Sequence, residues 1–381
     1  MTKYFFSGPQ GSIPLGPDHL ALPFRIGPSR VHPFLTLGDY FKGIEEFVFR
    51  DGGKALGRLF REASSMDILP EQIQDLSIFS EKHGALYHLS RVQATAGKLR
   101  VDFCVTTALG ESKAWLVREF EVLRLLERSF HPPCLPKPFF AGEIHRAVGE
   151  DVETFSMLAS QWFTGFHEWH LSMDKIQSRP KVHIWDQEGG YRFASREETF
   201  ELFRQAARIL TLYYDTQDFR QISPWHHGAG DFVINCTGGS TQVRLTTARN
   251  YRPLMVFPAK HRLNPLLALI YFFLNLTVKM RLDKLDGTGQ TAWAEETTLK
   301  AATVGFFEAL QMMEAEGRYG LGKPGDLHAL LKSFGPQELG TLFNGLADLY
   351  QEEDPSDLLV IQKHWGDHIK GLFEALQDRR L

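Results

Sequence analysis

The spacing of apolar residues predicts β-strands in the middle of the chain. Between residues 86 and 162, polar and apolar side chains alternate in short runs, a pattern typical of strands. The runs cover residues 86–92, 99–105, 138–144 and 154–162, and Ala96-Gly97 can form a turn between the first two. Before the third run, Leu116, Phe120 and Leu123 recur at helical spacing, which predicts a helix from Ser112 to Glu127. This region is therefore expected to form two strands, one helix and two more strands.

Beyond Trp162, helical spacing dominates. Helices are predicted from Arg196 to Asp215 and, in several pieces, from Asn264 to the end. A strand pair at Phe232–Ile234 and Val243–Thr246 interrupts them, because Gly238-Gly239-Ser240 is a good hairpin turn. The last helix is expected to begin at Pro355, after Asp354. Its apolar residues, all expected to face a core, are Leu358, Leu359, Ile361, Trp365, Ile369 and Leu376.

These patterns predict an α+β protein in three parts. Residues 1–80 are expected to form an N-terminal arm and helical extension: the first 40 are rich in glycine, proline and aromatic residues, and a short helix follows near Gly53 to Ser64. Residues 81–163 are expected to form a small, β-rich lobe with an antiparallel sheet. Residues 164–381 are expected to form a larger, mostly helical lobe.

Composition narrows the class of protein. A net charge of −4 gives no general basic field, so nucleic-acid binding is not expected. Three widely spaced cysteines form neither a disulfide framework nor a cysteine zinc site, and the N-terminal residues have no apolar secretory signal. The most apolar run, Pro265–Val278, is too short to span a bilayer and predicts a buried helix. A cytoplasmic protein without membrane contact is expected.

The most informative segment runs from Pro224 to Ile234. It contains His226, His227 and Asp231 in a short loop between a predicted helix and an apolar strand. Gly228 and Gly230 allow a sharp turn and a close approach of backbone to a ligand. Histidine titrates near neutral pH and binds metals, and a carboxylate at the start of a strand is held at a fixed position. The segment therefore predicts a functional site.

The order of elements, with three local sequences, resembles the protein-kinase-like fold and in particular its aminoglycoside and choline phosphotransferase branch. The three segments are REFEVLRLL at 118–126, PKPFFAG at 136–142, and the apolar run from Phe155 to Phe163. They are similar to the helix of the small lobe, the strand after it, and the strand and hinge against which adenine lies. The resemblance implies a two-lobed fold.

The resemblance also implies roles for single residues. The Pro224–Ile234 segment corresponds to the catalytic loop, which places Asp231 at a metal-binding asparagine and His226 at the catalytic aspartate. Thr246 takes the place of the second metal-binding aspartate. On the cofactor side, the implied residues are Glu119, which would pair with a phosphate-binding lysine, Trp162 at the hinge, and Arg249 as a cation for phosphate or carboxylate.

Three departures from the family pattern indicate a degenerate site. The catalytic aspartate and the second metal-binding aspartate are exchanged, and residues 101–107 contain no lysine. Phosphoryl transfer depends on these groups. The leading hypothesis is a pseudokinase-type binding or regulatory module. The alternatives are a divergent phosphotransferase using His226 and Asp231, and a metal hydrolase built on His226, His227 and Asp231.

Structural roles compete with each functional one. The two histidines are adjacent and cannot point the same way, so one is expected to face inward. Asp231 can cap its loop through backbone N–H groups, and Arg249 can form a salt bridge to Asp231 or Glu119. Glu119 can instead be a solvated helix residue.

Two further segments leave a metal or cation role open. Aromatic residues at 162–170 can join two lobes or stack on a ligand, and His167 and His170 could share a metal only on a helix. Asp283 and Asp286 are expected in a polar turn.

The sequence does not identify a cofactor or a partner. A nucleotide with a divalent metal is the cofactor that the resemblance would imply. The ligand can be a small molecule or nucleotide, and a protein partner stays open.

Overall fold

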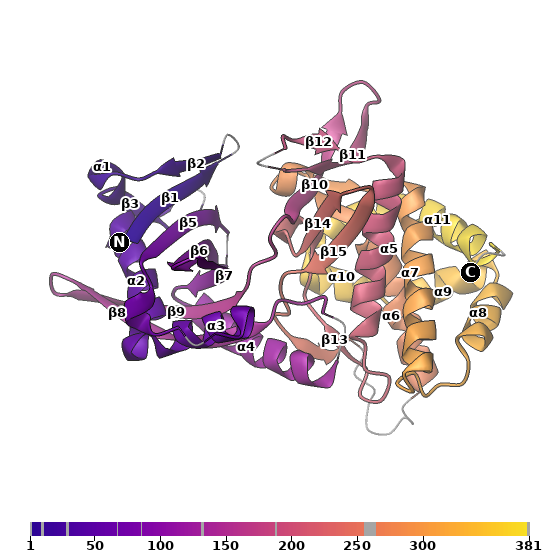
Figure 1. The fold of residues 1–381 in the computed structure, drawn as a ribbon. Helices are drawn as coiled ribbons and strands as arrows, with labels where there is room; N and C mark the ends of the chain where they lie inside the picture. The colour runs from indigo at the N-terminus through magenta and orange to yellow at the C-terminus, as the bar shows by residue number, and fades with distance from the viewer. Residues whose placement is uncertain are drawn as a thin grey trace. The chain divides into compact units, whose positions relative to one another are not determined.

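The computed structural model describes residues 2–8, 11–27, 30–66, 68–84, 86–130, 133–186, 189–254 and 264–378 (Figure 1). The chain forms two compact units. Unit 1 contains Met1–Ser129 and Pro136–Thr164, and unit 2 contains Phe130–Leu135 and Gly165–Leu381. Both combine helices with mostly antiparallel strands, so the expected α+β class is confirmed. No helix among the described residues is long and apolar enough to cross a membrane.

Unit 1 is built on a seven-stranded sheet in the order β2-β1-β5-β6-β7-β9-β8. All neighbouring strands are antiparallel except β1 and β5, which are parallel. The strands are β1 (Thr2–Gly8), β2 (Gly11–Pro14), β5 (Asp75–His83), β6 (His88–Ala96), β7 (Leu99–Ala108), β8 (Pro138–Val148) and β9 (Asp151–Gln161). The helix α4 (Ser112–Ser129) follows β7, as the sequence predicts. The hairpin of β6 and β7 turns after Ala96, which pairs with Leu99.

The N-terminal residues differ from the extended arm expected over residues 1 to about 40. They supply two strands of the main sheet and the beginning of a buried helix, α2, because their aromatic side chains join the core of unit 1: Phe24, Tyr40 and Phe41 are fully buried. The other elements of this region are α1 (Pro17–Leu20), β3 (Pro23–Arg25), β4 (Val31–Thr36), α2 (Leu37–Phe49), η1 (Arg50–Gly53), α3 (Lys54–Ser64) and η2 (Pro70–Gln72).

Unit 2 contains a five-stranded sheet in the order β12-β11-β10-β14-β15, with two small strand pairs, β13-β16 and β17-β18. Its strands and 3-10 turns are β10 (His167–Asp174), β11 (Arg179–Ile184), β12 (Arg192–Phe193), β13 (Arg220–Ile222), η3 (His227–Ala229), β14 (Phe232–Thr237), β15 (Ser240–Leu245), β16 (Tyr251–Pro253), β17 (Leu282–Lys284), η4 (Leu285–Gly287) and β18 (Thr291–Trp293). The predicted hairpin is confirmed: β14 and β15 pair up to Thr237 and Ser240, around Gly238-Gly239.

The helices of unit 2 are mostly those that the apolar spacing predicts. They are α5 (Arg196–Leu212), α6 (Pro265–Lys279), α7 (Glu296–Ala315), α8 (Pro324–Ser333), α9 (Pro336–Asn344), α10 (Ala347–Glu353) and α11 (Pro355–Leu376). α5 and α7 run side by side (Figure 1). Asp354 caps α11 as expected, but Leu359 is 69% exposed. Since neighbouring residues on a helix point about 100° apart, the burial of Leu358 turns Leu359 toward solvent.

Candidate functional site

The predicted loop lies between β13 and β14 in unit 2, and its glycines shape it. Residues 227–229 form the short turn η3, and Gly230 ends that turn with a φ of 72°. A β-carbon on Gly228 would lie 2.9 Å from Lys284 Cγ and 3.0 Å from His226 Nδ1. A side chain at residue 228 would therefore displace its neighbours, while Gly230 adopts a conformation that favours glycine. The sharp turn expected from these two residues is confirmed.

Asp231 is held by an ion pair at the start of β14. The Arg249 guanidinium donates to both carboxylate oxygens, from Nη1 at 2.7 Å and from Nη2 at 2.6 Å. The backbone N–H of His226 donates to Oδ2 as well, at 2.9 Å. The Asp231 side chain is 1% exposed. Of the alternatives open from the sequence, the structure has both the loop cap and the salt bridge to Arg249. Three donors therefore bind the carboxylate, two at Oδ2 and one at Oδ1.

His226 connects the loop to the N-terminus of α11. Its Nδ1 accepts a hydrogen bond from the backbone N–H of Gly228 at 2.9 Å, so a neutral ring carries its proton on Nε2. That Nε2 lies 3.4 Å from Asp357 Oδ2, and Lys284 Nζ donates to Asp357 Oδ1 at 2.9 Å. Burial raises the pKa of Asp357, but hydrogen bonds from His226, Lys284 and Thr291 outweigh it and hold the pKa below its usual range. His226 therefore faces an ionised carboxylate.

His227 points the other way, into an apolar interior. It is 2% exposed, and neither ring nitrogen has a hydrogen-bond partner among the described residues. Burial lowers its pKa to about 4. At neutral pH the ring is uncharged, so the expected acid or base near neutrality is not found at His227 in this structure. The aromatic rings around it are those of Trp169, Phe203, Trp225 and Phe232, with centroids 4.8–5.6 Å away.

Glu119 and Trp162 belong to unit 1. Glu119 lies on α4 and is 4% exposed, so it is not the solvated helix residue that was one of its alternatives. Its charge adds to the main effect of burial in raising the pKa of the Cys104 thiol on β7 to about 12. Trp162 follows β9 and is half-buried, with the Arg91 guanidinium 5.8 Å from its ring centroid.

The aromatic segment after Trp162 forms a strand, whereas His167 and His170 could share a metal only on a helix. His167 and His170 lie on β10, and residues three apart on a strand point to opposite faces, so they do not form the metal pair that a helix would give. His170 is buried beside two carboxylates, with Glu168 Oε1 2.8 Å from Nε2 and Asp283 Oδ1 3.5 Å from Nδ1. Burial lowers the pKa of His170, but its contacts with Asp283 and Glu168 outweigh this and raise it.

Asp283 is buried on β17, not in the polar turn that the sequence predicts, and it accepts a hydrogen bond from the backbone of Leu171. Asp286 does lie in a turn, η4, where it accepts a hydrogen bond from Ser172. Over the described part of the chain, no three histidine, cysteine or acidic residues are grouped to hold a metal ion.

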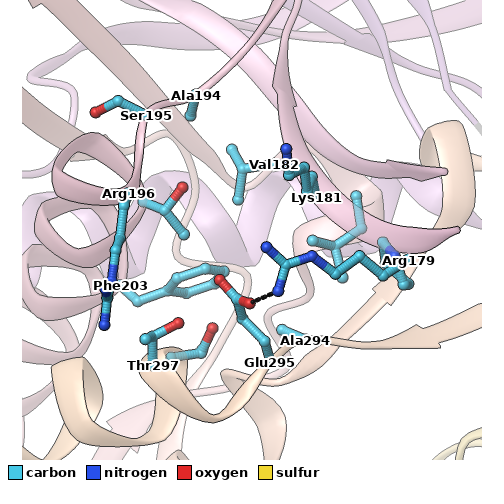
Figure 2. A pocket seen from close by; sticks show the side chains of 14 residues that line it. Arg179, Lys181, Val182, Ala194, Ser195, Arg196, Phe203, Ala294, Glu295 and Thr297 are labelled. Carbon is cyan, nitrogen blue, oxygen red and sulfur yellow. Dashed lines mark hydrogen bonds and ion pairs between the residues drawn. The ribbon is translucent and has the colours of Figure 1, made fainter. Parts of the chain in front are cut away.

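Two cavities are formed by residues that the sequence analysis did not single out. The first, of about 430 Å³, lies in unit 2 between β11 and the N-terminal ends of α5 and α7 (Figure 2). The second, of about 340 Å³, lies in unit 1 between α3, α4 and β8. Neither is lined by His226, Asp231, Thr246 or Arg249. The signal in the sequence was the group of basic residues Arg179, Lys181 and Arg196 around a predicted helix start.

Comparison with models of known protein families finds no match to this chain. Comparison with curated proteins also finds no similar sequence.

Proposed function

We propose that this chain is a pseudokinase-type ligand-binding or regulatory protein, with a two-lobed protein-kinase-like fold and a degenerate active-site loop. The order of elements supports the proposal. In unit 1, β6, β7, α4, β8 and β9 follow the order of two strands, one helix and two strands that carried the resemblance. In unit 2, α5, the loop at residues 223–231 and the β14–β15 hairpin follow one another as the family pattern requires.

The ion pair between Asp231 and Arg249 is the observation that carries the proposal. Kinase-type phosphoryl transfer needs metal ions held by oxygen ligands. Asp231 occupies the position of such a ligand in the resemblance, yet both its oxygens bind a guanidinium, and the charge of Arg249 opposes a divalent cation beside it. At the second metal position, the hydroxyl of Thr246 donates to the Asp231 carbonyl oxygen at 3.1 Å. In this proposal, both positions serve to hold the loop together.

The position of the catalytic base supports the same conclusion. His226 stands there in the resemblance, but its Nδ1 is occupied by the Gly228 N–H and its Nε2 faces Asp357. A base has to reach a substrate hydroxyl within hydrogen-bond distance. The neighbouring His227 is enclosed by aromatic rings. Neither imidazole presents a free nitrogen in an open cavity that the structure describes.

The proposal is tested by measuring phosphate release from ATP by the purified chain with Mg²⁺ or Mn²⁺. We expect no turnover above a heat-inactivated blank. The paired variant Asp231→Asn/Arg249→Gln is the control, because it removes both charges of the buried pair together. Metal-dependent turnover in the wild type that this variant loses would contradict the proposal.

A divergent phosphotransferase is the second candidate, because the Asp357 carboxylate can orient the His226 ring and keep its proton on Nε2. In this candidate, Nδ1 acts as the base in a conformation that releases it from the Gly228 N–H. This candidate predicts that ATP with Mg²⁺ raises the melting temperature, since a ligand that binds only the folded state stabilises it. It fails if neither nucleotide nor divalent metal changes the melting temperature relative to a sample with EDTA.

A further inference from the structure

The cavity of about 430 Å³ in unit 2 is lined by both charged and apolar side chains (Figure 2). Its basic residues are Arg179 and Lys181 on β11 and Arg196 at the first position of α5, against one acidic residue, Glu295. Arg179 Nη1 donates to Glu295 Oε2 at 2.7 Å, and Lys181 pairs with Asp174 at 2.8 Å. Arg179 and Lys181 are thus each paired with a carboxylate, and Arg196 adds a third positive charge. The carboxylate of Glu295 lies where an incoming anion would meet Arg179.

The N-terminus of α7 also faces this cavity, through Glu295, Thr297 and Thr298. The first turn of an α-helix leaves backbone N–H groups without acceptors inside the helix, and it is the positive end of the helix dipole. Glu295 is the N-cap residue, but its side chain makes no capping hydrogen bond, because its carboxylate binds Arg179. In the first turn of this helix of 20 residues, the N–H of Thr298 donates to the Glu295 carbonyl at 3.1 Å, and no described side chain caps the turn. An anion can take the place of the missing side-chain cap.

Two buried hydroxyl groups at the cavity lack the hydrogen bond that Thr303 and Thr211 make within their helices. The Oγ1 atoms of Thr297 and Thr298 are buried without a hydrogen-bond partner among the described residues, and Thr298 is 1% exposed. Thr303, also buried on α7, donates to the carbonyl of Leu299 at 2.9 Å, and Thr211 on α5 donates to that of Ala207 at 2.8 Å. A buried hydroxyl without a partner is unfavourable. At a cavity wall, a bound ligand can supply the partner.

The remaining wall is apolar. Leu171, Val182 and Phe203 line the cavity and are almost fully buried. The volume is within the range of about 300–1,000 Å³ that is usual for small-molecule sites. The site therefore suits a ligand with an anionic end and an apolar body.

We propose that this cavity binds a small organic phosphate. The phosphate group accepts hydrogen bonds from Arg179, from the first turn of α7 and from the hydroxyls of Thr297 and Thr298, while the apolar body packs on Phe203. A phosphate is favoured over a carboxylate because these donors come from several directions, and three terminal oxygens can meet more of them than two. This site does not depend on the catalytic state of the loop at residues 223–231.

The test uses phenyl phosphate as a probe, with melting temperature and calorimetric titration of the full chain in phosphate-free buffer at constant ionic strength. We expect saturable binding of phenyl phosphate, weaker binding of inorganic phosphate, and little effect of phenol or benzoate. Equal binding of benzoate would overturn the choice of phosphate. An absence of saturable phenyl phosphate binding would overturn the proposal itself. Neither result bears on ATP turnover, so the proposed function is tested separately.

Two variants locate the binding. Thr298→Val removes an unpartnered hydroxyl, so we expect the free protein to melt no lower than the wild type while the Kd for phenyl phosphate rises about tenfold or more. Glu295→Gln removes the competing carboxylate and is expected to lower that Kd severalfold. Glu46→Gln is the matched control for Glu295→Gln, since Glu46 is similarly exposed and pairs with an arginine, Arg146, in unit 1. If both cavity variants bind like this control, the proposed site is wrong.

Discussion

The two adjacent histidines show how far a single residue's chemistry depends on its surroundings. His226 is hydrogen-bonded and faces a carboxylate, while His227 is enclosed by aromatic rings with no partner for either nitrogen among the described residues. Charging a buried imidazole costs free energy because water no longer solvates it. The same residue type therefore has a polar, connected role at one position and an apolar, packing role at the next.

His227→Phe is expected to make the protein less sensitive to acid. The pKa of His227 is about 4 in the folded state, below its ordinary value of 6.5 in the unfolded chain. The stability that comes from keeping this ring neutral is fully present above pH 6.5. It is lost as the pH falls from 6.5 toward 4, because the histidine then binds a proton in the unfolded state but not in the folded state. This proton linkage lowers the free energy of unfolding of the wild type by about 3 kcal/mol at pH 4, and the phenylalanine variant avoids that decrease. Free energies of unfolding from urea titrations between pH 7 and 4 measure it. His145→Gln, at an exposed position, is the control, and parallel pH profiles for wild type and His227→Phe would contradict the prediction.

Arg249→Gln is expected to destabilise the protein much more than removing a similar arginine at the surface. It leaves the buried carboxylate of Asp231 without its counter-charge, which costs roughly 3–5 kcal/mol. Arg192 also makes two bonds to one carboxylate, that of Glu198, but it is 44% exposed, so Arg192→Gln is expected to cost about 1 kcal/mol or less. Chemical denaturation of both variants gives the comparison. Equal losses would show that burial does not decide the strength of the Asp231 pair.

Among the helices, α11 makes a direct contact with the candidate loop. Its first turn carries Asp357, which contacts His226 on the loop and Lys284 on β17. Asp354 caps the helix by accepting a hydrogen bond from the Ser356 N–H at 2.8 Å. The loop is thus held by a segment more than 120 residues further along the chain.

Asp354→Ala is expected to cost about 1 kcal/mol of stability and to increase hydrogen exchange at His226 and Gly228. Losing the cap frays the first turn, and Asp357 moves with it. Asp354→Ser keeps a capping oxygen but loses the charge that pairs with Lys284, so it separates the two roles. Asp348→Ala, at an exposed position on α10, is the control for removing a carboxylate. Unchanged exchange at the loop in Asp354→Ala would show that α11 does not hold it.

At the scale of the whole molecule, the chain builds two units from interleaved segments. It passes between them at Ser129–Phe130, Leu135–Pro136 and Thr164–Gly165. The chain therefore contributes residues 130–135 to unit 2 before β8 and β9 complete the sheet of unit 1. In unit 2, the carbonyl of Cys134 accepts a hydrogen bond from the backbone N–H of Leu245.

Much of the fold could be predicted from residue spacing. The helix α4, the hairpins β6–β7 and β14–β15, and the capped start of α11 were all anticipated, because each follows from a local period, turn or cap. The position of residues 1–40 in the main sheet could not be predicted in this way, since β1 joins the sheet by pairing with β5, about 70 residues further along the chain. Local patterns carry no information about such a distant partner.

The sharp turn of the loop at Pro224–Ile234, and its two imidazoles and one carboxylate, follow from the residues of the loop alone, because glycines and residue types act locally. What these groups face depends on how the chain folds. Arg249, Asp357 and the aromatic rings around His227 come from distant parts of the chain, and they set the charge and the solvation of each group. The same holds for the cavity between β11, α5 and α7, whose donors become one site only because folding brings three separate elements together.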